Sequence, residues 1–165
     1  MDVNAVRDAT RWVVFRVESN RYALPLSAVL RIVRAAQVTP LPLAPDVVLG
    51  AIDVEGDILP VFNLRQRFRL IGRELHPSDH FLLARTGRRT VVLVIDQPLG
   101  VVEYPAEAVI EAATLAPDLP HVRGVLRWSD GIVVIQDLEA LLSPDEEAAL
   151  DASLAQSTLP SAHAC

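Results

Sequence analysis

Cysteine, lysine and aromatic residues are scarce or missing in this sequence. The one cysteine, Cys165, is the last residue, and one thiol cannot form an internal disulfide, so the fold does not depend on an oxidising compartment. All fifteen basic residues are arginine, which we attribute to coding bias. Aromatic residues make up 5% of a chain that is 51% apolar, so the core must be built mainly from aliphatic side chains.

Long hydrophobic runs are absent as well. The longest purely aliphatic run, Val91–Ile95, is far shorter than the roughly 20 residues that a membrane-spanning helix needs. The first ten residues lack the hydrophobic region of a signal peptide. The net charge of −6 argues against a binder of duplex nucleic acid, which normally presents a basic face. We therefore predict a cytoplasmic protein with no membrane insertion and no nucleic-acid partner.

Signatures of catalysis and metal binding are also missing. The four histidines lie in loops or in the tail, no glycine-rich phosphate loop precedes a helix, and Ser129 and Ser143 have no nearby histidine. Three acidic residues cluster in the segment 53–57 without a calcium-loop pattern or a second ligand cluster. We predict no catalytic residue, no metal and no cofactor, which leaves binding to partner proteins as the default function.

The segment 47–65 is the part around which the chain is organised. It predicts a strand over 47–54, a tight turn at 55–57 and a second strand over 58–63. The glycine of the turn lies between two acidic residues, which allows a positive φ angle and keeps the tip solvated. Pro60 cannot donate a hydrogen bond to a strand ladder, so the second strand is expected at a sheet edge or at a bulge.

The same pattern returns 74 residues later, where residues 121–142 align with residues 47–68 without a gap. This offset predicts two structurally similar halves, each built on one hairpin. Two copies are too few for a solenoid, which needs about three repeats to bury its core. The matching pairs include Gly50 with Gly124, Ile58 with Ile132, and Asn63 with Asp137.

Short strands with proline and glycine between them are expected along the rest of the chain. Residues 27–33 are predicted to form a short helix with Val29, Ile32 and Val33 on one face. The proline-rich segments 37–46 and 105–120 are predicted to be connectors. About ten short strands predict an all-β fold with closed or nearly closed sheets. Beyond the two hairpins, strands are expected at 12–17, 21–26, 80–85, 90–95 and 101–104.

A helix is predicted at the C-terminal end. Ser143 provides the cap, Pro144 the first helical position and Glu146 the capping-box residue, and the pattern continues to about Ala155.

Taken together, these residues resemble the CheW-like family of chemotaxis coupling proteins over about residues 11–155. The strongest match is G-A-I-D-V-E-G-D-I-L-P-V-F-N-L-R at 50–65. It is supported by R-Y-A-L-P-L at 21–26, V-L-V-I-D at 92–96 and L-E-A-L-L-S-P-D-E at 138–146. The resemblance implies two interlocked five-stranded SH3-like β-barrels with short helices and a C-terminal helix. The expected organisation is a flexible tail (1–10), a CheW-like domain (11–143), the helix (144–155) and a disordered tail (156–165).

The resemblance also implies a function without enzymatic activity. Such adaptors bind the regulatory domain of a CheA-type histidine kinase and the cytoplasmic tip of chemoreceptors, and so couple the two in a bacterial signalling array. In the family, the groove between the barrels takes the receptor helix, and exposed barrel ends pair with the kinase.

Two charges depart from the family pattern. Glu55 stands where the family has an arginine, and Arg31 stands where the family has an acidic residue. We expect the two positions to lie close together, and the paired reversal to change partner choice, because like charges placed opposite each other cost affinity. The candidate partner contacts are Arg31, Glu55, Gly56, Asp57 and Arg65. Val29 and Ile32 are candidates to line the receptor groove, with the core of the short helix as the equal alternative.

Other functions are also consistent with parts of the sequence. An accessory CheW-like scaffold of a pilus, surface-motility or other dedicated pathway fits the same motifs with a different partner. A barrel that binds a small ligand is the alternative from another class, although barrels of this size fill with their own side chains. An RNA-binding barrel would need exposed aromatic residues on a basic sheet.

Overall fold

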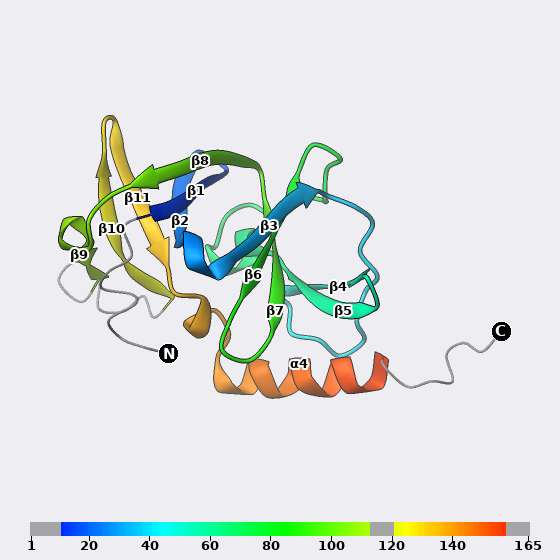
Figure 1. Ribbon diagram of the computed structural model, residues 1–165. Coiled ribbons are helices and arrows are strands. Elements are labelled where there is room, and N and C mark those ends of the chain that lie inside the picture. The colour runs from blue at the N-terminus through cyan, green and yellow to red at the C-terminus, as the bar shows by residue number, and fades with distance from the viewer. Residues whose placement is uncertain (1–10, 113–120, 158–165) are drawn as a thin grey trace.

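The computed structural model describes residues 11–112 and 121–157 (Figure 1). The expected tail at 1–10, most of the expected tail at 156–165, and residues 113–120 lie outside the described residues. The strands are β1 (Arg11–Val17), β2 (Asn20–Pro25), β3 (Val29–Arg34), β4 (Val48–Val54), β5 (Asp57–Phe62), β6 (His80–Arg85), β7 (Thr90–Ile95), β8 (Gln97–Glu103), β9 (Ile110–Glu111), β10 (Val122–Trp128) and β11 (Gly131–Gln136). The helices are η1 (Leu26–Ala28), α2 (Leu64–Arg67), η2 (Ala106–Ala108), η3 (Leu138–Ala140) and α4 (Pro144–Ser157), where η marks a 3₁₀ turn.

The strands form two sheets that repeat one arrangement. Sheet A has the order β8-β1-β2-β11-β10-β9, and sheet B has the order β3-β6-β7-β5-β4. Each sheet contains one parallel pair, β2 with β11 in sheet A and β5 with β7 in sheet B. The isolated bridge between Thr39 and Ala51 stands in sheet B where β9 stands in sheet A. The expectation of an all-β fold with two small barrels is confirmed, with six strands instead of five in one sheet.

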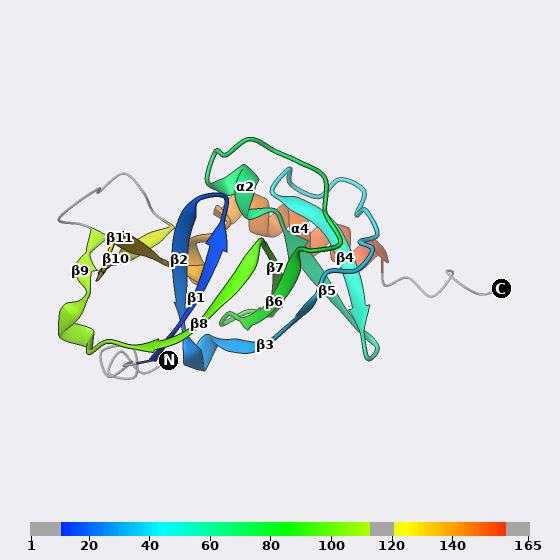
Figure 2. The same ribbon diagram turned by 90° about the horizontal axis from the view of Figure 1, so that it is seen from above.

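Sheet A takes its strands from two separated parts of the chain, and sheet B from the part between them. The first hairpin, β1–β2, belongs to sheet A, but the chain then crosses to sheet B, where β3 pairs with β6. After the hairpin β6–β7 it crosses back, and β8 pairs with β1. Figure 2 shows these crossings between the two sheets. Because sheet A is completed only after the chain has built sheet B, the barrels are interlocked, as predicted.

The internal repeat is confirmed in atomic detail. Gly50 pairs with Val61 and Gly124 pairs with Ile135, and each ladder shifts its register at the glycine. The repeat extends to the turn that follows each hairpin. The side chain of Asn63 accepts a hydrogen bond from the Arg65 N–H, and the side chain of Asp137 accepts one from the Glu139 N–H.

The segment 27–33 is a strand, not the predicted helix. Only Leu26–Ala28 is helical, as one 3₁₀ turn, and β3 then pairs with β6 from Val29 to Arg34. The apolar spacing allowed one helical face, but the β-branched residues here fit a strand, and pairing with β6 satisfies their backbone groups. Long-range strand pairing therefore decides the structure of this segment.

Other element boundaries also differ from the predictions. β8 begins at Gln97, where a break was expected, and Gly100 supports the change of register with φ of +114°. The predicted connector 105–120 contains η2 and the short strand β9. Helix α4 continues to Ser157, so the first two residues of the expected disordered tail are helical.

The core explains why β1 and β6 read as continuous apolar runs. In β1, Phe15 belongs to a large cluster shared by both sheets, whereas Trp12 and Val14 belong to a cluster inside sheet A. In β6, Leu82 joins the shared cluster, and Phe81 joins a cluster inside sheet B. Both strands are therefore buried on both faces, and such strands lose the alternation of apolar and polar residues.

Helix α4 lies against sheet B (Figure 1) and closes the shared core. Leu150 is fully buried in that core, and the Ser153 hydroxyl donates to the Pro42 carbonyl oxygen at 3.0 Å. The Arg67 guanidinium donates to the Glu146 carboxylate at 2.7 Å. The N-terminus of α4 forms the predicted capping box, because Ser143 and Glu146 each accept the backbone N–H of the other.

Candidate functional site

The tip of the β4–β5 hairpin holds three of the predicted contact residues. Val54 pairs with Asp57, so the turn has two residues, Glu55 with φ of +53° and Gly56 with φ of +92°. The Asp53 carboxylate accepts the Gly56 N–H at 2.8 Å and holds the turn in this shape. Asp57 is therefore the first residue of β5, not part of the turn. The three residues of the tip, 55–57, are exposed, and the local surface is acidic.

Strand β3 holds the other predicted contacts. Arg31 is exposed, and Val29 and Ile32 are half-buried and pack against the shared core. Because β3 is a strand, the apolar residues that it presents to solvent are instead Leu30 and Val33, which are 53% and 37% exposed. Val29 and Ile32 thus contact the core, but they do so from a strand and not from the predicted helix.

The expected closeness of Arg31 and Glu55 is not found. Sheet B has the order β3-β6-β7-β5-β4, so Arg31 lies on one outermost strand and Glu55 at the tip of the hairpin on the other side. Among the ion pairs of the described residues, none joins these two side chains. The two reversed charges therefore do not form an ion pair with each other in the described part of the chain.

The placement of Arg65 beside the hairpin at a partner surface is corrected by its burial. Its side chain is 8% exposed, and its guanidinium binds Asp96 at 2.8 Å and also the Glu18 carboxylate. Glu18 belongs to the β1–β2 turn and Asp96 to the junction between β7 and β8, so Arg65 joins sheet A to sheet B. The other arginines of this segment differ from Arg65: Arg69 is exposed, and Arg67 is paired with Glu146.

Asp79 extends the ionic network around Arg65. Its carboxylate accepts hydrogen bonds from Arg73 at 2.7 Å and from the His76 N–H at 2.8 Å, and Arg73 also reaches Asp96 at 3.3 Å. Burial raises the pKa of Asp79, but the hydrogen bonds from Arg73 and His76 outweigh it and hold the pKa below its usual range. The carboxylate is therefore charged near neutral pH, and the network has a structural role.

A stack of four rings joins β1 and β2 to the residue that ends α2 and to the residue before β10. Phe15 stacks on Tyr22, Tyr22 on Phe68 with 4.3 Å between centroids, and Phe68 on His121 with 5.9 Å. Burial, followed by the nearby positive charges of Arg67 and Arg69, lowers the pKa of His121. The imidazole is therefore held neutral in the folded state.

We expect stability to fall when the pH drops below the ordinary histidine pKa. Because the folded state holds the pKa of His121 below 6.5, the unfolded state takes up a proton first, and the free energy of unfolding decreases as the pH falls through this range. Urea titrations at about pH 7.5 and about pH 5.5 measure this decrease. His121→Phe keeps the ring stack and removes the charge, so its decrease is expected to be smaller. An equal decrease in this variant would assign the effect to other groups.

The predicted contact residues did not include two groups of exposed apolar side chains. The first is the outer-strand face, made by β3 and β8, which lie along the same side of the molecule in Figure 2. Each is an end strand of its sheet. The strands present Leu30, Val33, Leu99 and Val101 to solvent, with Val101 55% exposed. The apolar character of 29–33 was visible in the sequence, but its exposed face depends on the strand register.

The second missed feature is a pair of equivalent isoleucines near the tips of the two repeated hairpins. Ile58 is 37% exposed and Ile132 is 53% exposed. These hairpins lie at opposite ends of the molecule in Figure 1. The signal was present in the sequence, because the 74-residue offset aligns the two residues. Their surroundings differ: the first tip is acidic, whereas the second has Arg21 stacked 5.5 Å from the Trp128 ring and paired with Asp130.

Metal sites and membrane-spanning helices were also sought among the described residues. Within 11–112 and 121–157, no group of three histidine, cysteine or acidic side chains could hold a metal ion. In the same part of the chain, none of the helices has the length and apolarity to cross a membrane.

Comparisons with known proteins agree with this geometry. A family model described as the CheW-like domain matches residues 11–146. "Chemotaxis protein CheW" of Treponema pallidum is 26% identical over 144 residues, covering 81% of this chain and 82% of that protein. The protein of the same name from Klebsiella aerogenes is 26% identical over 142 residues, covering 85% and 86%. "Protein FrzA" of Myxococcus xanthus is 29% identical over 129 residues, covering 74% and 78%.

A solved structure has the same fold. The crystal structure of the scaffolding protein TtCheW from Thermoanaerobacter tengcongensis superposes with a TM-score of 0.76. The sequences are 22% identical, and the match covers 84% of this chain and 95% of that one.

Proposed function

The chain belongs to the CheW-like domain family, and from this membership we propose that it is a non-enzymatic adaptor that couples chemoreceptors to a CheA-type histidine kinase. The observation that supports this most strongly is the match of one family model to residues 11–146, which include both interlocked sheets. In this proposal the chain acts in the cytoplasm as a bridge between two protein partners. Its function depends on surfaces that bind those partners and needs no catalytic group.

The kinase contact is proposed for the ends of the barrels. The β4–β5 hairpin combines an exposed isoleucine, Ile58, with an exposed charge at its tip, Glu55, on a turn fixed by the Asp53–Gly56 hydrogen bond. A rigid tip loses little conformational entropy on binding. The repeat places an equivalent isoleucine, Ile132, at the other end, which gives the adaptor two related docking points.

The receptor contact is proposed for the outer-strand face. Leu30 and Val33 on β3 and Leu99 and Val101 on β8 leave apolar side chains on two end strands, one from each sheet. An amphipathic helix buries its apolar face on such a surface. Arg31 and Arg34 flank the apolar residues of β3, and both are exposed. We propose that they contact acidic side chains at the edge of a receptor helix.

A dedicated pathway is the second candidate within this class. Glu55 and Arg31 reverse the charges of the family pattern without pairing with each other among the described residues, so each charge is free to change a contact with a partner. The relative named FrzA, at 29% identity, shows that the similarity extends beyond proteins named CheW. We propose that the acidic tip selects a kinase whose contact surface is basic, in an accessory scaffold of a pilus, surface-motility or other pathway.

The alternative from a different class, a barrel that binds a small ligand inside, has less support. The interiors of the two barrels are filled by buried side chains. They include Trp12 and Leu126 in the barrel of sheet A and Phe81 and Leu83 in the barrel of sheet B. Filled interiors of this kind are the rule for small barrels.

Reversal of the charge of Glu55 is expected to weaken binding to the kinase about tenfold. The purified chain and its Glu55→Arg variant are titrated calorimetrically with the regulatory domain of the CheA-type kinase encoded in the same genome. With arginine at position 55, the tip loses its attraction to a basic surface and is repelled by it. A tenfold increase in the dissociation constant corresponds to roughly 1.4 kcal/mol of binding free energy. Because φ is positive at Glu55, both residues carry a similar backbone strain, and the comparison isolates the charge.

Two further variants make the titration specific. Glu107→Arg makes the same charge change at an exposed position in η2, outside the hairpin, and is expected to bind like the parent chain. The double variant with Arg31→Glu is expected to show the sum of the single effects, because the two sites do not touch. If the parent chain binds no kinase regulatory domain, the proposed function is wrong, while the fold stands.

A further inference from the structure

The two barrels are joined at two places that the internal repeat makes equivalent. The 74-residue offset aligns Arg65 with Glu139, and each of them follows the repeated hairpin of its own sheet. Arg65 follows sheet B and reaches Glu18, in the β1–β2 turn of sheet A. Glu139 follows sheet A and reaches Gly87, in the β6–β7 turn of sheet B. We call the contacts of Arg65 with Glu18 and Asp96 the first joint, and the contact of Glu139 with Gly87 the second joint.

The first joint is buried and contains several contacts. The Arg65 guanidinium binds Asp96 at 2.8 Å and also binds Glu18, and the Arg65 side chain is 8% exposed. The Glu18 N–H donates to the Asp96 carboxylate at 2.9 Å, and Arg73 reaches the same carboxylate at 3.3 Å. Hydrogen bonds and charge pairs are stronger where water is largely excluded, so the barrels are held firmly at this place.

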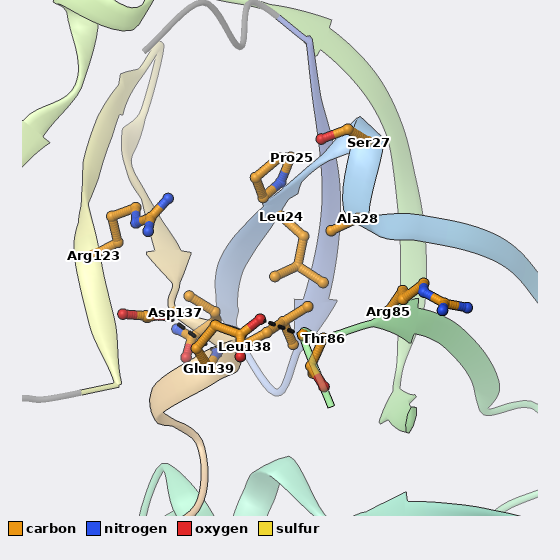
Figure 3. A pocket seen from close by; sticks show the side chains of 12 residues that line it. Leu24, Pro25, Ser27, Ala28, Arg85, Thr86, Arg123, Asp137, Leu138 and Glu139 are labelled. Carbon is orange, nitrogen blue, oxygen red and sulfur yellow. Dashed lines mark hydrogen bonds between the residues drawn. The ribbon is translucent and has the colours of Figure 1, made fainter. Parts of the chain in front are cut away.

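The second joint is exposed and lies beside a cavity. Among the polar contacts of the described residues, it consists of one hydrogen bond, from the Gly87 N–H to the Glu139 carboxylate at 2.6 Å. The cavity has a volume of about 280 Å³, and its walls come from β2 and η1, from the β6–β7 turn, and from β10, β11 and η3 (Figure 3). Parts of both sheets line this space. Because protein interiors are otherwise close-packed, such a space leaves room for the two sheets to move against each other.

Gln136 makes the packing at the second joint weaker than at the first. The repeat aligns it with Phe62, which is 3% exposed and belongs to the shared core. Gln136 lines the cavity and is also 3% exposed, but its Nε2 and Oε1 atoms have no hydrogen-bond partner among the described residues. A buried carboxamide without partners is unfavourable. A movement that gives this amide access to water therefore relieves a cost that does not exist at Phe62.

We propose that the two barrels form a hinge, with the first joint as its pivot and the second joint as a latch that opens and closes at the cavity. Opening the latch breaks one exposed hydrogen bond, whereas moving the pivot would break a buried ion pair. The hinge follows from contacts within the chain and does not depend on the proposed function. Ile58 and Ile132 lie near the hairpin tips of different barrels, so opening would change the angle at which two partners are held. Only this consequence rests on the proposed function.

Amide hydrogen exchange of the full chain, followed by NMR, compares one N–H group at each joint. The Gly87 N–H donates to Glu139 at the latch, and the Glu18 N–H donates to Asp96 at the pivot. Opening of the latch exposes only the Gly87 group, so we expect it to be at least about tenfold less protected than the Glu18 group. Glu139→Ala is expected to speed exchange at Gly87 by a further factor of about five, with no change at Glu18. Equal protection of the two groups in the parent chain would contradict the hinge.

Distances between the barrels distinguish a hinge from local fraying of the β6–β7 turn. Spin labels are attached to Asp57→Cys and Ser129→Cys, two exposed positions at the tips of the two repeated hairpins, in a chain that also carries Cys165→Ser. Pulsed electron paramagnetic resonance then gives the distribution of label distances. Glu139→Ala is expected to broaden this distribution, whereas Glu107→Ala, at an exposed position in η2, is expected to leave it unchanged. An unchanged distribution in Glu139→Ala would reduce the latch to a local turn contact and refute the hinge.

Filling the cavity is expected to have the opposite effect. Gln136→Phe introduces the residue that the repeat has at Phe62, and Gln136→Leu is a smaller replacement that avoids overpacking. At least one of these variants is expected to raise the thermal midpoint, to slow exchange at Gly87 about tenfold and to narrow the distance distribution. If both variants lower the midpoint, the glutamine stabilises the closed arrangement and the proposal is wrong. Parent-like exchange and distances in both variants would equally exclude a role of the cavity in a hinge.

Discussion

Arg65→Met is expected to lower the free energy of unfolding by about 3 kcal/mol, because it removes the cation nearest to the Asp96 carboxylate, which keeps only the longer contacts with Arg73 at 3.3 Å and Arg16 at 4.0 Å. The Arg65 side chain is 8% exposed and Asp96 is 13% exposed, so water cannot replace the lost ion pair there. Glu18 is 46% exposed and can be solvated, which keeps the effect at the lower end of the range for buried pairs. Methionine retains most of the apolar volume of the arginine stem. Chemical denaturation with urea measures the change.

The matched control is Arg69→Met in the same short segment. Arg69 is exposed and forms no ion pair among the described residues, so the change in stability is expected to be within about 0.5 kcal/mol. The double variant Arg65→Met/Asp96→Asn is expected to recover part of the loss, because it also removes the largely buried charge that has lost its nearest cation. If Arg65→Met were as stable as Arg69→Met but lost partner binding, Arg65 would belong to a contact surface after all.

Gly50→Ala is expected to lower the free energy of unfolding by roughly 2–5 kcal/mol through backbone strain and overpacking. Gly50 has φ of +154°, and a Cβ atom would lie 2.1 Å from the Thr39 carbonyl oxygen. That oxygen accepts the Ala51 N–H at 2.8 Å, and Thr39 donates to the Ala51 oxygen at 3.0 Å, so the overlap breaks the bridge that closes sheet B. Thermal unfolding followed by circular dichroism reports the loss as a lower midpoint.

Two other glycine variants serve as comparisons for Gly50→Ala, one at the equivalent position of the repeat and one at a position with free space. A Cβ atom at Gly124, the equivalent of Gly50, would lie 2.5 Å from the Ile110 carbonyl oxygen, so Gly124→Ala is expected to destabilise the protein as well. Nothing lies within 4 Å of a Cβ atom at Gly72, and Gly72→Ala is expected to change the midpoint little. Equal midpoints for Gly50→Ala and Gly72→Ala would show that strand β4 shifts to accommodate the methyl group.

The hairpins and the C-terminal helix could be read from the sequence because their signals are local. A two-residue turn with glycine fixes its strands, and the Ser143–Glu146 capping box fixes the start of α4. The repeat at an offset of 74 aligned Asn63 with Asp137, and the structure shows that both cap the turn that follows them. The prediction of a helix at 27–33 was wrong because the apolar spacing of this segment fits one turn of helix as well as a strand. Only the pairing of β3 with β6 distinguishes the two structures.

The candidate site was predicted less well than the fold. Exposure of Glu55 and Gly56 follows from their place in a turn, and it could be expected from the sequence. The burial of Arg65 could not, because its partners Glu18 and Asp96 are far away in the chain and meet it only where the two sheets join. The sequence also could not show that Arg31 and Glu55 form no ion pair in the described part of the chain, since pairing depends on how the strands of sheet B are arranged.

By itself, the sequence determined the all-β class, the repeated hairpins, the turn residues and the capped helix, since each depends on residues within one or two turns of the chain. Only the tertiary structure decided that sheet B is inserted between the two parts of sheet A, which faces of β1 and β6 are buried, and which charged residues pair. These properties depend on contacts such as β1 with β8 and Arg65 with Asp96, whose partners the chain brings together only when both sheets are complete. The same long-range closure leaves apolar side chains of the outer strands and of the two hairpin tips exposed to solvent.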